Sequence, residues 1–153
     1  MPRFTATVHW QRGEQIFTDN RYSRAHHWEF DGGQLIPASA SPHIVPAPMS
    51  VAANVDPEEA FVVSLSSCHM LFFLSLAAER DVVVDDYIDQ AVGTMRRNNY
   101  GRMVIGEVVL HPRATYSGCV PSPTTVEELH AEAHHRCFIA SSVRSDVRIE
   151  VVS

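Results

Sequence analysis

The segment from Asp56 to Glu79, DPEEAFVVSLSSCHMLFFLSLAAE, constrains the fold more than any other part of the chain. Asp56 suits the N-cap of a helix, Pro57 suits the first helical position, and Glu59 stands three residues after Asp56, as in a capping box. Acidic side chains in the first turn also favour the positive end of the helix dipole. These signals predict that a helix begins at Pro57.

This predicted helix is apolar on almost every side. Apolar residues recur at helical spacing along one face, and the remaining positions of the helix are nearly as apolar. A helix with this pattern is normally buried, so the other elements of the fold are expected to surround it, with Cys68 near its middle. The repeating face holds Phe61, Leu65, Cys68, Phe72 and Leu76, and the other apolar residues are Val62, Val63, Met70, Leu71, Phe73 and Leu74.

The length of 153 residues and the hydrophobic content of 45% predict one domain over residues 1–153. The formal net charge is -6, and the basic residues are scattered along the sequence. This distribution predicts neither a nucleic acid nor a membrane surface as a partner.

The first residues, MPRFTATVHWQRGEQ, lack the pattern of a signal peptide, and no uninterrupted apolar run reaches the roughly 18 residues of a membrane span. The cysteines at 68, 119 and 137 form no CxxC motif and are too few for a secreted disulfide scaffold. A cytoplasmic protein is therefore expected, in which any disulfide is transient.

The rest of the chain alternates strands with one further helix. Before residue 50, a strand is expected at 4–10 and two extended pieces between 13 and 33, with turns at 19–20 and 31–33. A proline-containing loop over 37–48 follows. After the first helix, a hairpin over 82–112 turns at RNNYGR, and a loop with Cys119 comes next. A second helix over 123–142, capped by Thr124 with Glu127 three residues on, precedes a strand over 145–153. The predicted class is α+β.

Cys137 falls on the apolar face of the second helix, with Leu129 and Ala133. If the cysteine-bearing faces of the two helices pack together, the sulfurs of Cys68 and Cys137 come within reach of a disulfide, which needs Cα atoms roughly 4.4 to 6.8 Å apart. The alternative is that both cysteines are only small buried hydrophobic residues.

A reactive Cys68 needs a nearby cation, because it lies about 15 Å from the start of its helix, at ~1.5 Å per residue, where the helix dipole contributes little. His69 and His135 are possible, but an arginine stays charged and offers two donors, so Arg24 is the favoured candidate, with Arg12 and Arg21 as weaker ones.

Two stretches resemble the OsmC/Ohr family. DPEEAFVVSLSSCHMLFFLSLAAE is similar to the family's central helix, in which an acidic residue precedes the reactive cysteine by ten positions, as Glu58 precedes Cys68. AEAHHRCFIASSV is similar to its second cysteine helix, and the likeness extends from about residue 20 onward.

The resemblance implies an OsmC-like fold, with antiparallel sheets wrapped around two cysteine-bearing helices in an intertwined homodimer. It also implies a thiol-dependent peroxidase for organic hydroperoxides, with no cofactor or metal, that is recycled by a dithiol reductant such as a lipoylated protein. By this resemblance Cys68 attacks the peroxide, Cys137 resolves the product as a disulfide, Glu58 is the acidic partner and Arg24 the activating arginine.

The helix length limits how these groups can meet. With about 15 Å of helix between Glu58 and Cys68, one arginine contacts both only by stretching along the helix, unless Glu58 comes from a partner chain. We favour the partner chain. Glu59 competes with Glu58 for the role, and Cys119 is expected to be incidental.

Two other functions remain open. His130 and His134 stand four residues apart with Cys137 one turn further on, which could indicate a metal site, although a second ligand pair is missing and histidines in this pattern usually lie on a solvated face. A non-catalytic module of the same fold that binds a small hydrophobic ligand is the other alternative.

Overall fold

Helix α1 runs from Pro57 to Glu79 and begins as the sequence predicts. The backbone N–H of Glu59 donates to Asp56 Oδ1 at 2.8 Å, and the N–H of Asp56 donates to Glu59 Oε2 at 3.1 Å. This reciprocal pair confirms the capping box.

The computed structural model describes residues 1–153, which divide into two compact units, Met1–Ala60 and Phe61–Ser153. The division falls within the first turn of α1. This division into compact units does not test the number of domains, so the single domain over residues 1–153 stays a prediction.

The Met1–Ala60 unit contains an antiparallel sheet in the order β1-β2-β3, with strands Ala6–His9, His26–Phe30 and Leu35–Ala38. The strand expected at 4–10 is confirmed in part of that range. Of the two extended pieces expected before residue 33, one is a strand, β2. Strand β3 lies partly in the segment predicted as a loop, and it accommodates Pro37 because it is an edge strand.

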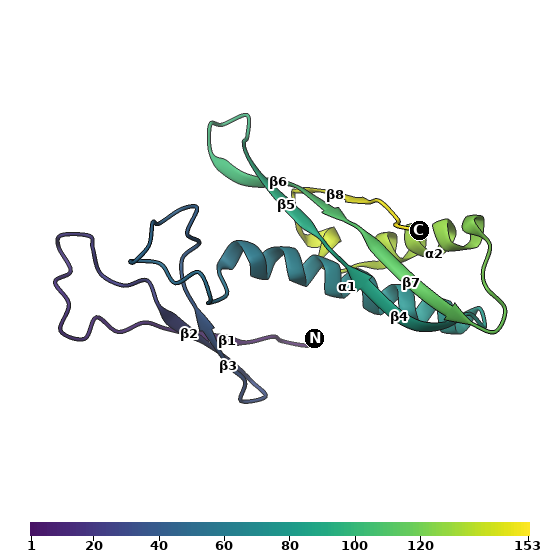
Figure 1. Cartoon of the computed structure of the whole chain (residues 1–153), viewed down its shortest axis with the longest axis horizontal. Coiled ribbons are helices and arrows are strands. Elements are labelled where there is room, and N and C mark those ends of the chain that lie inside the picture. The colour runs from purple at the N-terminus through teal and green to yellow at the C-terminus, as the bar shows by residue number, and fades with distance from the viewer. The chain divides into compact units, whose positions relative to one another are not determined.

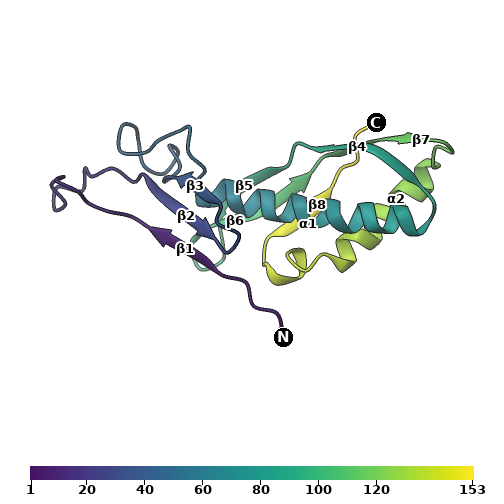
Figure 2. The ribbon, with the colours of Figure 1, turned by 90° about the horizontal axis from the view of Figure 1, so that it is seen from below.

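The Phe61–Ser153 unit holds the five remaining strands (Figures 1 and 2). Strands β5 and β6 form the part of the expected hairpin next to its turn, but residues 83–89 of the predicted first arm form a separate strand, β4. Strand β8 lies parallel beside β6, whereas the resemblance implies antiparallel sheets. Strand β4 pairs with β7, which was predicted as part of a loop. The bounds are β4 Val83–Asp89, β5 Val92–Arg97, β6 Met103–Leu110, β7 Pro112–Ser117 and β8 Asp146–Ile149.

Helix α2 spans Pro123–Arg136, which is shorter than predicted. Its N-cap is Ser122, whose Oγ accepts from the Thr125 N–H at 3.2 Å, and the prediction of Thr124 as the cap is wrong. Proline has no N–H to donate and suits the first helical position, so Pro123 sets the cap one residue before it. A short 3-10 turn, η1 at Ala140–Ser142, follows after a break.

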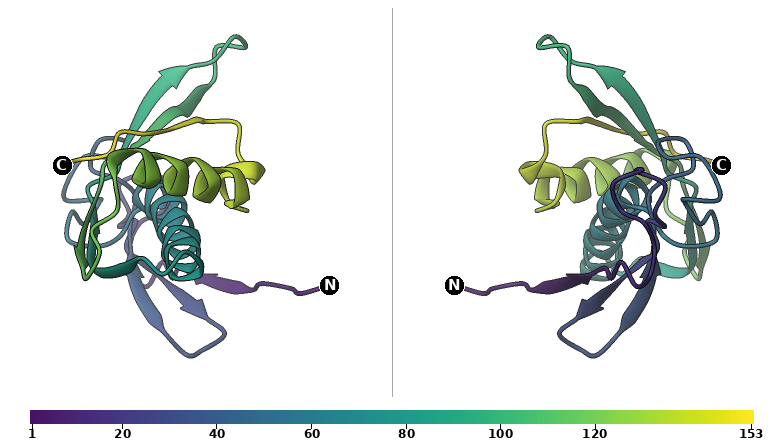
Figure 3. Two further views of the ribbon diagram at one scale, coloured as in Figure 1. Left: turned by 90° about the vertical axis from the view of Figure 1, so that its right-hand side faces the viewer. Right: turned by 90° about the vertical axis from the view of Figure 1, so that its left-hand side faces the viewer.

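Two hydrophobic clusters fill the space between the helices and strands of this unit. Figure 3 shows α2 from the side while α1 is nearly end-on, so the helices cross steeply. The first cluster joins α1 to α2 and the β4–β7 pair, and the second joins α1 to the β5-β6-β8 sheet. Their fully buried members are Phe73, Leu76, Ala77, Leu129 and Ala133 in the first, and Leu65, Val108 and Leu110 in the second.

The apolar composition of helix α1 predicts that it is buried on every side, but one of its faces is exposed. Val63 and Leu71 are 60% and 61% exposed, on a face that also includes Ser67 and Ser75. By length and composition α1 is also apolar enough to cross a membrane, so the expectation that no segment meets this criterion is wrong. A core helix meets the same criterion, and α1 contributes side chains to both hydrophobic clusters.

Candidate functional site

Cys68 lies in the middle of α1 and is half-buried. It shares a helix face with Leu65 and Phe72, which pack into the second and first hydrophobic cluster respectively. The helix therefore holds its thiol at the junction of the two clusters, in largely apolar surroundings.

Cys137 lies just after the last turn of α2, where it is the C-cap rather than a residue of the helix. Only 1% of its surface is exposed. Its N–H donates to the His134 carbonyl at 3.3 Å, and its Sγ accepts from the Ala140 N–H at 3.3 Å. The sulfur thus gives a partner to a backbone N–H beyond the helix end, which helps to fix the turn toward η1.

The thiol of Cys68 lies close enough to Cys137 to raise the pKa of the Cys137 thiol. Burial, and to a smaller extent the Cys68 thiol, raise the pKa of Cys137 to about 11, although the Ala140 N–H that donates to its sulfur acts in the opposite direction. Cys137 therefore keeps its proton near neutral pH. All three cysteines of the chain are free thiols in this structure.

Arg24 belongs to the Met1–Ala60 unit, where its guanidinium is held by local groups. Nη2 donates to the Asn20 carbonyl at 3.1 Å and to Asn20 Oδ1 at 2.8 Å, and Nη1 donates to the Tyr22 carbonyl. The guanidinium carbon lies 3.7 Å from the centroid of the Tyr22 ring. Arg24 is thus positioned as a cation beside an aromatic ring.

The same unit contains an apolar hollow of about 510 Å³ beside Arg24. Phe17 and Tyr22 stack with their ring centroids 4.7 Å apart, and Trp10 packs against Tyr22 at 5.3 Å. His26 and Pro57 complete much of its wall. The hollow suits an alkyl or aryl group next to a charged guanidinium.

Glu58 is half-buried and makes no hydrogen bond or ion pair within its unit, whereas Glu59 is engaged in the capping box. The structure therefore assigns the capping role to Glu59 and leaves Glu58 available for another partner. Of the four predicted site residues, Cys68 and Cys137 are brought together. An approach of Arg24 or Glu58 to Cys68 stays a prediction.

A buried pair of histidines was missed by the sequence reasoning. His69 Nε2 lies 2.9 Å from His130 Nδ1, and the two side chains are 1% and 4% exposed. The His130 ring also stacks on Phe73 with centroids 4.2 Å apart. The expectation of a solvated face is therefore wrong for His130. The position of His69, directly after Cys68 in an apolar helix, was the available signal.

The two histidines are stable in the fold only as neutral rings. The pKa of each is lowered to about 4, mainly by burial. His134 contributes to the lowering for His69, where Asp89 acts in the opposite direction, and His69 contributes to it for His130. No group of three His, Cys, Asp or Glu side chains is arranged to hold a metal ion. The His69–His130 contact is thus a hydrogen bond across the α1–α2 interface.

Because His69 and His130 are neutral in the folded chain, we predict that the free energy of unfolding falls in weak acid. The unfolded chain takes up these protons near pH 6.5 and the folded chain only near 4, so protonation favours unfolding as the pH falls through this window. Between pH 7.5 and 5 the free energy of unfolding should fall by about 2 kcal/mol for one histidine and by up to twice that for both.

Urea titrations across this pH range measure the effect, and carboxyl groups interfere little because they ordinarily titrate near pH 4. The double variant His69→Gln/His130→Gln should show a flatter pH dependence, while His43→Gln, at an exposed position, should keep the wild-type slope. An equal slope in the double variant would contradict the assignment.

A protein-family model described as OsmC-like protein matches residues 51–152. Among solved structures, an OsmC-like protein of unknown function from Vibrio cholerae is 52% identical over 99% of this chain and 100% of that chain, with a TM-score of 0.98. A comparison with curated proteins found no match.

Two more distant structures are similar in fold. The organic hydroperoxide resistance protein OsmC from Legionella pneumophila is 17% identical over 100% of this chain and 98% of that chain, with a TM-score of 0.68. The organic hydroperoxide resistance protein OhrB of Bacillus subtilis is 20% identical over 97% and 98% of the two chains, with a TM-score of 0.63.

Proposed function

Because the chain belongs to the OsmC-like protein family, we propose that it is a thiol-dependent peroxidase that reduces organic hydroperoxides. The main support is the proximity of Cys68 to Cys137, whose pKa it raises. The names of the Legionella and Bacillus proteins, both organic hydroperoxide resistance proteins, support the substrate class.

Cys68 is the peroxide-attacking residue in this proposal. Its thiolate attacks the peroxide oxygen that carries the hydrogen, the O–O bond breaks, and the oxygen bound to the organic group leaves as an alkoxide, which takes a proton from the solvent to become an alcohol. Cys68 becomes a sulfenic acid, so sulfur is oxidised by two electrons and the peroxide is reduced by two. The half-buried position of Cys68 leaves it less enclosed than Cys137 and suits it to this first step.

Cys137 is the resolving residue. Its sulfur attacks the sulfenic acid, the S–S bond forms, and the hydroxyl group leaves with the Cys137 proton as water. The raised pKa of Cys137 keeps that proton on the sulfur until this step. An external dithiol, such as that of a lipoylated protein, then reduces the disulfide and restores both thiols.

Arg24 and Glu58 complete the site in a homodimer. Arg24 stabilises the Cys68 thiolate and the leaving oxygen, and Glu58 of the partner chain holds Arg24. Two observations support a partner chain. The carboxylate of Glu58 has no hydrogen bond or ion pair within its unit, and α1 has an exposed apolar face with Val63 and Leu71. A crystal structure with Glu58 and Cys68 of one chain both contacting Arg24 would reject this arrangement.

The apolar hollow beside Arg24 supports alkyl or aryl hydroperoxides over hydrogen peroxide, because an organic group would fill it. The same hollow favours the alternative function, a non-catalytic module that binds a small hydrophobic molecule. The redox reaction of the thiols separates these two functions. A cytoplasmic location remains part of the proposal, since a reducing compartment would supply the dithiol.

Counting free thiols tests the function directly. Reduced protein has three cysteines, and one equivalent of an organic hydroperoxide should remove two thiols together, leaving one. An intramolecular disulfide should appear by mass spectrometry as the loss of two hydrogens. If all three thiols remain while a hydrophobic molecule binds, the alternative function replaces the peroxidase.

A further inference from the structure

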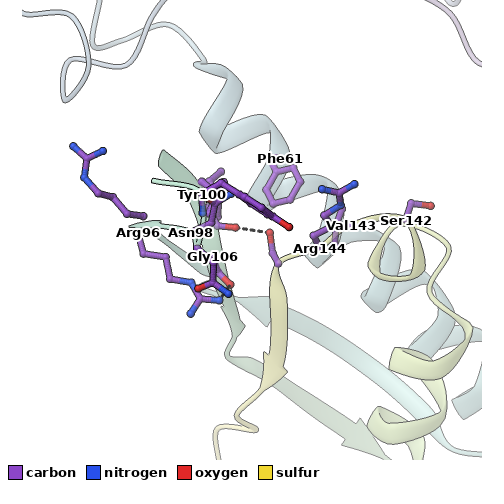
Figure 4. Close-up of a pocket in the computed structure, with 13 residues that line it drawn as sticks. Phe61, Arg96, Asn98, Tyr100, Gly106, Ser142, Val143 and Arg144 are labelled. Carbon is purple, nitrogen blue, oxygen red and sulfur yellow. Dashed lines mark hydrogen bonds between the residues drawn. The ribbon is translucent and has the colours of Figure 1, made fainter. Parts of the chain in front are cut away.

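A second hollow, of about 800 Å³, lies in the Phe61–Ser153 unit, between the turn of the β5–β6 hairpin and the segment from η1 to β8 (Figure 4). Its lining contains Arg96, Arg97 and Arg144 and no acidic residue. The volume falls within the range of small-molecule sites. No step of the proposed peroxidase reaction uses it.

The charge of this hollow is opposite to that of the whole chain. The chain has 18 acidic and 12 basic residues, and all the basic ones are arginines. In the same unit Arg80, Arg136 and Arg148 form ion pairs with glutamates. The three arginines of the hollow form none within the unit, so their charges are available to an anion.

Two of these arginines are held in place by the hairpin. Arg96 lies flat over Gly106, where Nη2 donates to the Gly106 carbonyl at 3.2 Å. A Cβ at position 106 would come within 1.9 Å of Arg96 Nε, so a glycine is required for this arrangement. Arg97 Nη1 donates to the Gly101 carbonyl at 2.9 Å. Both side chains are thus partly preorganised.

Arg144 comes from the opposite side of the hollow. The next residue, Ser145, donates through Oγ to the Ile105 carbonyl at 2.5 Å and attaches this segment to β6. Figure 4 shows Arg144 beside Phe61, with the Tyr100 side chain lying across the hollow toward it. Residues far apart in sequence therefore line one hollow from two sides.

The hollow also offers apolar surface. Phe61, Ile105 and Val143 line it and belong to the second hydrophobic cluster, so their positions are fixed by the core. Tyr100 is 87% exposed, and its ring is free to cover a ligand. The turn that carries Tyr100 is ordered by Asn98 Oδ1, which accepts from the Tyr100 N–H at 2.9 Å.

We propose that this hollow binds a small organic anion, a carboxylate or phosphate ester with an apolar group. The arginines bind the anionic head, and the Phe61, Ile105, Val143 and Tyr100 side chains contact the apolar part. The site is independent of the proposed peroxidase function, because its ligand needs no reactive thiol.

Calorimetric titration of the reduced full chain with four probes tests this site: octyl phosphate, octanoate, inorganic phosphate and 1-octanol. At least one of the two organic anions should bind, and more tightly than inorganic phosphate and 1-octanol. Added sodium chloride should weaken binding, because ions screen the exposed arginines. Binding of both organic anions would indicate a general anion site, and binding of one would identify the head group.

The variant Arg144→Gln should weaken binding of the organic anion by about tenfold or more, the usual effect of losing a charge-assisted hydrogen bond. Arg113→Gln is the matched control, since Arg113 is an exposed arginine outside the hollow, and it should leave binding unchanged. Equal losses in both variants, equal binding of 1-octanol or of inorganic phosphate, or no binding of either organic anion at millimolar concentration would overturn the proposal.

Discussion

Replacement of Cys68 by serine is expected to abolish hydroperoxide reduction, lowering the rate by roughly 10³-fold or more, because a serine hydroxyl without a general base is a poor nucleophile. The variant should retain the two thiols of Cys119 and Cys137 after one equivalent of an organic hydroperoxide. Consumption of the hydroperoxide, followed together with free thiols, measures both effects.

Two further cysteine variants make this result specific. Cys119 is exposed and has no part in the thiol pair, so Cys119→Ser should react at the wild-type rate and form the same disulfide. Cys137→Ser should still consume one equivalent of peroxide but should stop at the Cys68 sulfenic acid, which a dimedone adduct reveals. Unchanged turnover by Cys68→Ser would remove the basis of the proposed peroxidase.

The largest expected effect on stability comes from Phe73→Ala, which should lower the free energy of unfolding by about 3 to 5 kcal/mol. Phe73 is fully buried between the helices and the β4–β7 pair. Its ring lies 4.2 Å from the His130 ring and 5.5 Å from the Tyr87 ring, centroid to centroid. A domain of this size is typically stable by only about 5 to 15 kcal/mol, so the variant should be close to unfolding.

Urea denaturation of the reduced protein at pH 7.5 measures this loss. Phe4→Ala is the matched control, because Phe4 is 93% exposed and the same atoms are removed from a solvated position. Its effect should stay within about 0.5 kcal/mol. A similar loss in both variants would show that the α1–α2 cluster is not the main source of stability.

Features that depend on neighbouring residues could be predicted from the sequence. The start of α1 follows from Asp56, Pro57 and Glu59, which act within one turn, and the structure contains this capping box. The β5–β6 hairpin follows from a polar turn between two strands rich in β-branched residues. The Thr124 cap was wrong because proline at position 123 favours Ser122, a preference that is equally local.

Strand pairings between segments that are distant in the sequence were harder to predict from the sequence. β7 was predicted as a loop, since its short alternating pattern gains stability only through β4, almost thirty residues earlier. The parallel pairing of β8 with β6 has no turn sequence to indicate it. The arginines looked scattered along the chain, but three of them line one hollow because β8 pairs with β6 of the hairpin.

The same distinction between local and long-range features applies to the candidate site. The sequence by itself determined that two cysteines lie near apolar helical faces and that Glu58 and Arg24 are candidates to act with them, because residue type and spacing are local properties. Only the tertiary structure decided that the thiols of Cys68 and Cys137 lie close together, that burial keeps Cys137 protonated, and that His69 and His130 pair in the core. Each of these depends on how α1 packs against α2, and packing brings together residues that the sequence separates by more than sixty positions.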